Sequence, residues 1–120
     1  MDINNPVVKL CIAGSQAEFE KKFDQARRLY LQAWEAAQDN FEACIAAHYV
    51  ARLQEQPEDR LYWNTIALKR ADMVDREQVQ PFYASLYLNM GHSYEILGRQ
   101  QEAEQYYNLA ASLGINHQPE

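Results

Sequence analysis

The sequence predicts an all-α protein, and three observations support this fold class. The chain has 120 residues with only four glycines and four prolines, so few positions would interrupt a helix. Alanine, leucine, glutamine, glutamate and arginine, which are strong helix formers, dominate its middle. No alternating run of β-branched residues bounded by turn dipeptides predicts a strand. With 48% hydrophobic residues, the chain can bury a core as one domain over residues 1–120.

Capping residues and prolines mark helix starts in the first half of the chain. Asn5 followed by Pro6 predicts a start, because asparagine caps a helix and proline suits its first turn. Asp39 and Asn40 can cap a third helix in the same way. Pro57 stands where a fourth helix should begin.

The clearest hairpin is predicted close to the end of the sequence. Apolar residues at positions 86, 87, 90, 94 and 97 follow helical spacing. Gly98 then predicts the end of this helix, because glycine tolerates a positive φ. The next helix carries small and aromatic residues, and two helices joined by so short a turn form an antiparallel hairpin. Those residues are Ala103, Tyr106, Tyr107, Ala110 and Leu113.

This segment resembles the tetratricopeptide repeat, which has an aromatic residue, Leu-Gly and Tyr on its first helix and Ala, an aromatic residue and Ala on its second. The matching residues are Tyr87, Met90, Gly91, Tyr94, Ala103, Tyr107 and Ala110. The corresponding places in an earlier copy hold Gly14, Ala26, Tyr30 and Ala33. A central copy holds His48, Arg60, Asn64 and Ala67, and its first three residues depart from the pattern. Matching positions lie 34 residues apart between the first two copies and 43 apart between the last two.

The resemblance implies a right-handed α-α superhelix of about six antiparallel helices. Its repeats would span about 7–40, 41–83 and 84–117. The second interval has nine extra residues, which we expect to extend a helix, because Asp75 and Gln78 have the spacing of a capping box. Pro81 should kink or interrupt this extension, since it lacks an amide donor.

The resemblance also implies a function, which is the capture of a protein or peptide segment in a concave groove formed by the first helix of each repeat. We therefore expect a scaffold or adaptor. The register places Cys11, Ile45, Ser85 and Leu88 on this face. The residues that we expect to bind the partner are Ser15, Glu18, Tyr49, Arg52, Asn89, His92 and Glu95.

One specific role within this family is not expected. Some tetratricopeptide proteins hold the C-terminal tails of heat-shock chaperones with Lys, Arg and Asn on successive first helices. None of the matching places here is basic, and only one is an amide, so we expect no adaptor of that type. These places hold Cys11, Ser15, Ala46, Ser85 and Asn89.

Charge and hydropathy bound the possible partners. The net charge of −6 argues against nucleic acid, because binding a phosphate backbone requires clustered Lys and Arg. No apolar run approaches the roughly 20 residues that span a bilayer, so we expect no membrane partner. The start of the sequence has no signal-peptide pattern, and we expect a cytoplasmic protein.

We expect no catalysis, no cofactor and no metal. No nucleophile motif, phosphate loop or paired carboxylates stand out. His48 and His92 could approach each other, with Cys44 or Glu95 nearby, but no metal-ligand spacing supports a site, and packed or hydrogen-bonded histidines are the favoured interpretation. A disulfide between Cys11 and Cys44 is conceivable, although two buried thiols are favoured.

Two alternatives to an adaptor remain open. The chain could be a regulatory sensor that binds a short peptide or small ligand, or a purely structural homo-oligomer. We expect only Gly114–Glu120 after the last helix, with no capping helix there. Leu109 and Leu113 could then pair with their counterparts in a homodimer, since an uncapped end of a helical array is adhesive.

Overall fold

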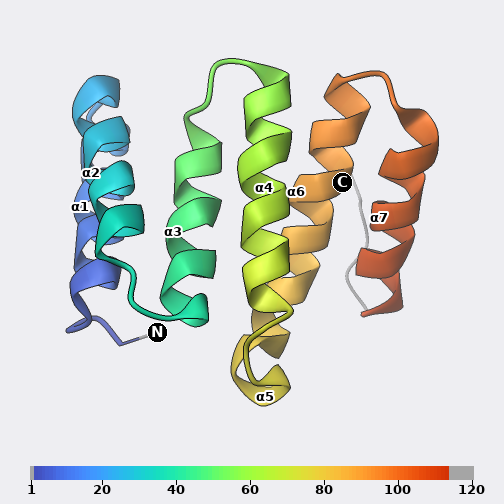
Figure 1. Cartoon of the computed structure of the whole chain (residues 1–120). Coiled ribbons are helices and arrows are strands. Elements are labelled where there is room, and N and C mark those ends of the chain that lie inside the picture. The colour runs from blue at the N-terminus through green and yellow to red at the C-terminus, as the bar shows by residue number, and fades with distance from the viewer. Residues whose placement is uncertain (1, 114–120) are drawn as a thin grey trace.

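The computed structural model describes residues 2–113, which form helices joined by turns, with no strand in that range (Figure 1). The all-α prediction is confirmed. Six longer helices account for most of the chain: α1 (Pro6–Phe19), α2 (Phe23–Ala36), α3 (Asn40–Arg52), α4 (Pro57–Ala71), α6 (Tyr83–Ile96) and α7 (Gln100–Ser112).

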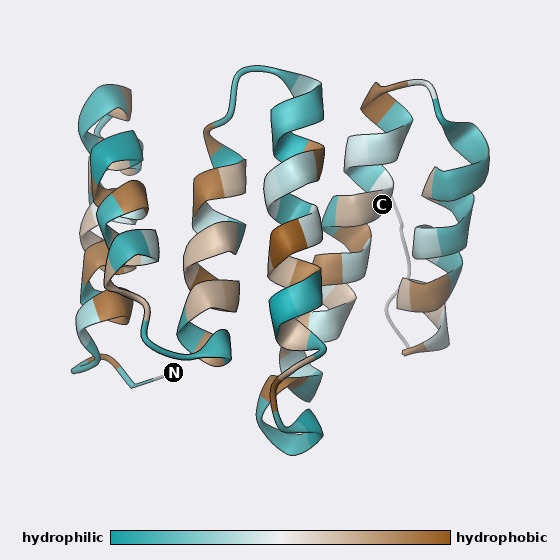
Figure 2. Cartoon of the chain, viewed as in Figure 1, coloured by the Kyte–Doolittle hydropathy of each residue, from teal (hydrophilic) through white to brown (hydrophobic). Residues whose placement is uncertain are grey.

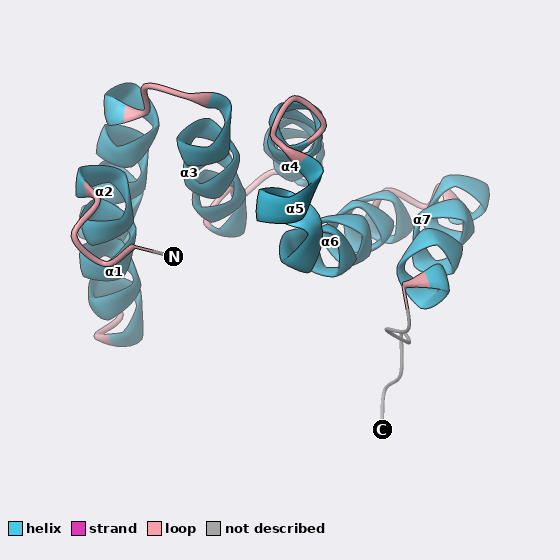
Figure 3. Cartoon of the chain, turned by 90° about the horizontal axis from the view of Figure 1, so that it is seen from below, coloured by secondary structure: helices cyan, strands magenta, loops and turns pink. Residues whose placement is uncertain are grey.

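These helices form three antiparallel hairpins that stand side by side in chain order (Figures 1 and 3). The pairs are α1 with α2, α3 with α4, and α6 with α7. Helix α3 packs on both helices of the first hairpin, and α6 packs on α4 of the second. The first helices begin at Pro6, Asn40 and Tyr83, which are 34 and 43 residues apart. The second helices begin at Phe23, Pro57 and Gln100, with the same two intervals.

The predicted caps of α1 and α3 are confirmed. The Asn5 side chain accepts hydrogen bonds from the amides of Val7 and Val8 at 2.8 and 3.2 Å. Asp39 accepts one from the amide of Glu42 at 2.8 Å. Each bond satisfies an amide that the first turn of a helix leaves unpaired.

The nine extra residues do not extend a helix as expected. Helix α4 ends at Ala71, and a short helix α5 (Arg76–Val79) and a 3₁₀ turn η1 (Gln80–Phe82) lead into α6. A short helix does begin directly after Asp75, but the predicted capping box is not formed, because the Asp75 side chain makes no capping hydrogen bond. The packing of this segment against α4 explains why the helix is not extended. Val79 is fully buried, and Tyr83 donates a hydrogen bond to Asp72 at 2.6 Å, so the segment folds back onto the end of α4. Pro81 interrupts the helix, as predicted.

Two equivalent turns close the first helices of the outer hairpins. Gly98 follows α6 with a φ of 76°, and Lys21 follows α1 with a φ of 63°. In each turn the next amide reaches back to a helix carbonyl, from Lys22 to Ala17 and from Arg99 to Tyr94, as in a Schellman cap. The predicted cap at Gly98 is confirmed, and the first hairpin makes the same turn with a lysine.

A glycine–tyrosine contact holds together each outer hairpin. A Cβ atom at Gly14 would lie 2.4 Å from the ring of Tyr30, and one at Gly91 would lie 2.5 Å from the ring of Tyr107. Both distances are well inside van der Waals contact. The tyrosine ring of the second helix therefore lies directly on the backbone of the first, which only glycine permits.

Alanines and aromatic rings build the core between the hairpins. Trp34 and Trp63 meet edge to face, with ring centroids 5.2 Å apart, and link the first and second hairpins.

Polar and apolar residues alternate along the helices in Figure 2. Within the described residues, none of the helices combines the length and the apolar character needed to cross a membrane.

We predict that Gly14→Ala destabilises the protein by about 1–3 kcal/mol, because the new methyl group overpacks against the buried Tyr30 ring. The better helix propensity of alanine offsets up to about 1 kcal/mol of this loss. Urea unfolding measures the change. The exposed Gln16→Ala on the same helix is the control, with an expected change below about 0.5 kcal/mol. Equal stability of Gly14→Ala and wild type would show that the ring does not rest on this glycine.

Candidate functional site

The outer hairpins carry the same hydrogen-bonded group on the face of their first helices. In the first hairpin, the Tyr30 hydroxyl donates to Glu18 at 2.8 Å and lies 3.3 Å from the Ser15 hydroxyl. Because Tyr30 has one hydroxyl proton, it accepts from Ser15. Burial raises the pKa of Tyr30 to about 12, so the phenol stays protonated.

The third hairpin repeats this arrangement with a histidine in place of the serine. The Tyr107 hydroxyl donates to Glu95, and His92 Nδ1 lies 3.0 Å from the same oxygen. Burial raises the pKa of Tyr107 as well. The four positions of this group, including Gly91, are each 77 residues after those of the first hairpin. The two groups are therefore built by equivalent residues.

A charged pair joins the first hairpin to the second. Arg52 donates to both carboxylate oxygens of Glu18, from Nε at 3.3 Å and from Nη2 at 2.8 Å. This arginine is at the place that Glu18 and Glu95 hold in their own hairpins. Hydrogen bonding to Arg52 lowers the pKa of Glu18 and keeps the carboxylate charged. The pair orients both side chains and places a carboxylate directly against the guanidinium of Arg52.

The central hairpin replaces the glycine–tyrosine contact with polar side chains. His48 is at the place of the glycines, and Asn64 is at the place of the tyrosines. The Asn89 amide nitrogen lies 3.2 Å from His48 Nδ1. An amide nitrogen can only donate, so Nδ1 accepts and the proton of neutral His48 is on Nε2. Burial, followed by the charge of Arg52, lowers the pKa of His48 and favours this neutral form.

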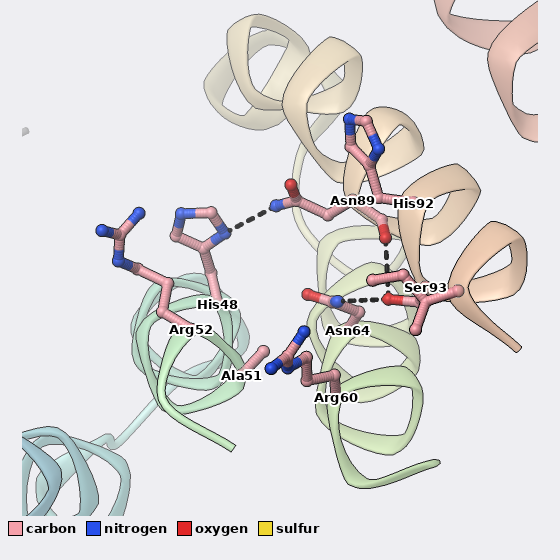
Figure 4. A pocket seen from close by; sticks show the side chains of 9 residues that line it. His48, Ala51, Arg52, Arg60, Asn64, Asn89, His92 and Ser93 are labelled. Carbon is pink, nitrogen blue, oxygen red and sulfur yellow. Dashed lines mark hydrogen bonds between the residues drawn. The ribbon is translucent and has the colours of Figure 1, made fainter. Parts of the chain in front are cut away.

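A chain of hydrogen bonds orients Asn64. Ser93 donates its hydroxyl proton to the backbone carbonyl of Asn89 at 2.8 Å, so its oxygen must accept from another donor. The Asn64 amide nitrogen supplies that bond at 2.9 Å. Asn64 and Ser93 are only 9% and 4% exposed. The Asn64 carbonyl oxygen is therefore left on the other side of the amide, toward the pocket (Figure 4).

These polar side chains surround a pocket of about 300 Å³ between α3, α4 and α6. Figure 4 shows Asn64 and Arg60 on α4, His48 and Arg52 on α3, and His92 and Asn89 on α6. The residues that line it are His48, Ala51, Arg52, Arg60, Asn64, Asn89, His92, Ser93 and Ile96. Most of these residues can donate or accept a hydrogen bond, so the pocket suits a polar ligand.

A smaller, more apolar pocket of about 110 Å³ adjoins it and shares His48. Tyr49 and Phe82 contribute aromatic rings to this second pocket. Tyr49 is held in place by Tyr30 and His48, whose ring centroids are 5.3 and 5.2 Å from its own. The other lining residues are Cys44, Ile45, Ser85 and Leu86. A polar pocket and an apolar one therefore lie next to each other along α3 and α6.

The structure brings together only part of the binding set predicted from the sequence. Arg52, Asn89 and His92 line the polar pocket, and Tyr49 lines the apolar one. Ser15, Glu18 and Glu95 line neither of these two pockets, and they bond instead to Tyr30 or Tyr107.

Two of the residues that the register placed on the groove are buried. Cys11 and Ile45 are 2% and 5% exposed, because they pack between the first and second hairpins. Of the expected dimer residues, Leu109 is 43% exposed, whereas Leu113 packs against the core cluster that contains Val79 and Tyr83.

The binding set predicted from the sequence did not include Arg60, Asn64 or Ser93. A signal for two of them was present, since Arg60 and Asn64 break the repeat pattern, as His48 does. All three of these departures line the polar pocket. Ser93 could not be found in this way, because only the packing of α6 on α4 brings it to Asn64.

The two cysteines are buried free thiols, as favoured from the sequence. Burial raises the pKa of Cys11 to about 12 and that of Cys44 to about 11. Thiols of this kind are poor nucleophiles at neutral pH. In residues 2–113, no three His, Cys, Asp or Glu side chains are grouped so that they could hold a metal ion.

Comparison of the chain with protein-family models, with curated proteins and with solved structures gave no match.

We predict a pH-dependent coupling between Glu18 and Arg52. The folded-state pKa of Glu18 lies below its ordinary value of 4.5, so the pair stabilises the fold above about pH 4.5 and loses this effect as the pH falls through the folded-state pKa. Because Arg52 is half exposed, we expect a coupling energy of only about 0.5–1 kcal/mol at pH 7.

A double-mutant cycle of Glu18→Gln and Arg52→Gln, followed by urea unfolding at pH 7 and pH 3, measures this energy. The exposed pair of Glu20 and Lys22 is the matched control, and we expect no measurable coupling there. A coupling energy that is the same at both pH values would show that the charge of Glu18 does not contribute.

Proposed function

We propose that this chain is a tetratricopeptide-type repeat protein that binds a protein or peptide segment and carries out no catalysis. In this proposal the three hairpins form a right-handed superhelix. Two observations support it. The helix starts recur at intervals of 34 and 43 residues, and Gly14 and Gly91 make the same contact with the tyrosine 16 residues later.

The proposed binding surface consists of the polar and apolar pockets and the side chains between them on α3 and α6. The observation that carries the proposal is that neighbouring side chains contact and orient both Tyr49 and Arg52. Tyr49 is held between two rings, and Arg52 is held by both oxygens of Glu18. Tyrosine and arginine are enriched at binding hot spots, and side chains that are already ordered lose less entropy when a partner binds.

An affinity capture from native lysate tests this proposal with a Tyr49→Ala/Arg52→Ala variant. The matched control is Tyr62→Ala/Arg28→Ala, which removes the same two residue types at exposed positions outside both pockets. We predict that wild type and control retain a protein that the surface variant loses by at least tenfold, which corresponds to about 1.4 kcal/mol of binding free energy.

Circular dichroism and urea unfolding establish that the variants are folded, because Tyr49 also packs on the core. If the double variant is unfolded, Arg52→Ala alone replaces it. Equal recovery by the folded surface variant and wild type, or a loss confined to the control, would contradict binding at this surface.

A further inference from the structure

The polar pocket exists because the central hairpin departs from the other two. In the outer hairpins a tyrosine ring covers the first helix at Gly14 and Gly91. The central hairpin has the shorter Asn64 at the tyrosine place, and no tyrosine ring covers the first helix there. Arg60 likewise takes the place of Ala26 and Ala103, both of which are fully buried. All three residues that depart from the repeat pattern therefore line the same cavity, namely His48, Arg60 and Asn64.

Arg60 brings an uncompensated positive charge to this cavity. Its Nε atom donates to the backbone carbonyl of Gln54 at 2.8 Å, just beyond the end of α3. This bond holds the guanidinium beside Ala51 of α3 (Figure 4). Within residues 2–113, Arg60 makes no ion pair, whereas Arg52 is already paired with Glu18. The two terminal nitrogens of Arg60 are therefore available to an anion, and their planar fork matches the two oxygens of a carboxylate.

The other groups in the pocket define the rest of the ligand. Neutral His48 carries its proton on Nε2 and can add a hydrogen bond to a bound oxygen. The carbonyl oxygen of Asn64 faces the pocket and requires a donor, because the Asn64 nitrogen is already bonded to Ser93. A suitable ligand therefore combines a carboxylate with an N–H group close to it. The single uncompensated charge of Arg60 is balanced by a monoanion.

We propose that this pocket binds a peptide carboxylate together with the amide N–H of the same residue. The carboxylate pairs with Arg60, and the amide donates to Asn64. The last residue of a chain and an internal aspartate both carry these two groups on a single residue. This inference names the ligand class for the surface under Proposed function and rests on that function.

Small blocked amino acids test the pocket without any protein partner. N-acetylglycine carries an amide and a terminal carboxylate, and N-acetyl-aspartate α-amide carries an amide and a side-chain carboxylate. N-acetylglycinamide and N-acetyl-asparagine α-amide are their neutral counterparts. NMR titration follows the Nε–H of Arg60 and the side-chain amide of Asn64. We expect saturable shifts with one or both carboxylates, which identifies the source, and none with the neutral compounds.

Arg60→Gln should weaken carboxylate binding at least tenfold, whereas Arg28→Gln, which changes an exposed arginine outside the pocket, should leave it unchanged. Arg60→Lys is the second variant if Arg60→Gln does not fold. It keeps the charge but not the fork, and it should bind more weakly than wild type.

Three results would overturn the proposal. They are the absence of saturable shifts with both carboxylates, equal binding by Arg60→Gln, and saturation by inorganic phosphate when neither carboxylate binds. Carboxylate binding without any captured protein would refute only the proposed adaptor function. Conversely, a captured protein without carboxylate binding would refute only this inference.

Discussion

The close contact of a glycine with a tyrosine ring is the constraint on which the architecture depends. It sets the distance between the two helices of each outer hairpin, since a Cβ atom at Gly14 or Gly91 would lie within 2.6 Å of the ring. The same ring carries its hydroxyl to a glutamate on the first helix, at Glu18 or Glu95. One tyrosine thus fixes both the packing of the hairpin and the position of an acidic side chain on its face.

The central hairpin has helices of similar length and spacing, but it lacks the glycine–tyrosine contact. Its polar replacements leave a cavity where a ring would lie, and their hydrogen bonds reach the third hairpin through Asn89 and Ser93. Buried polar groups must be paired, so this network restricts how α6 packs on α4. The same residues that depart from the repeat pattern therefore contribute both to packing and to the proposed binding chemistry.

The helix starts and the hairpins could be predicted from the sequence because their signals are local. Asn5 and Asp39 cap helices through neighbouring amides, and Gly98 ends one through its own φ. The path after α4 could not be predicted, since the burial of Val79 and Tyr83 depends on residues distant in sequence. The residues that line the two pockets were predicted only in part for the same reason. Register placed Arg52 and His92 on the expected groove face, and both line the polar pocket, but it could not show that Cys11 is covered by the next hairpin.

The packing geometry shared by the three hairpins is tested by converting the central hairpin to the pattern of its neighbours. Asn64→Tyr alone should destabilise the fold, because the new ring meets His48. Adding His48→Gly should recover most of this loss, and the residual should reflect the lower helix propensity of glycine and the lost hydrogen bonds to Ser93 and Asn89. Urea unfolding of the two variants provides the measurement. A double variant no more stable than Asn64→Tyr would contradict the claim that the three hairpins share one packing geometry and that the pocket lies at the place of a missing ring.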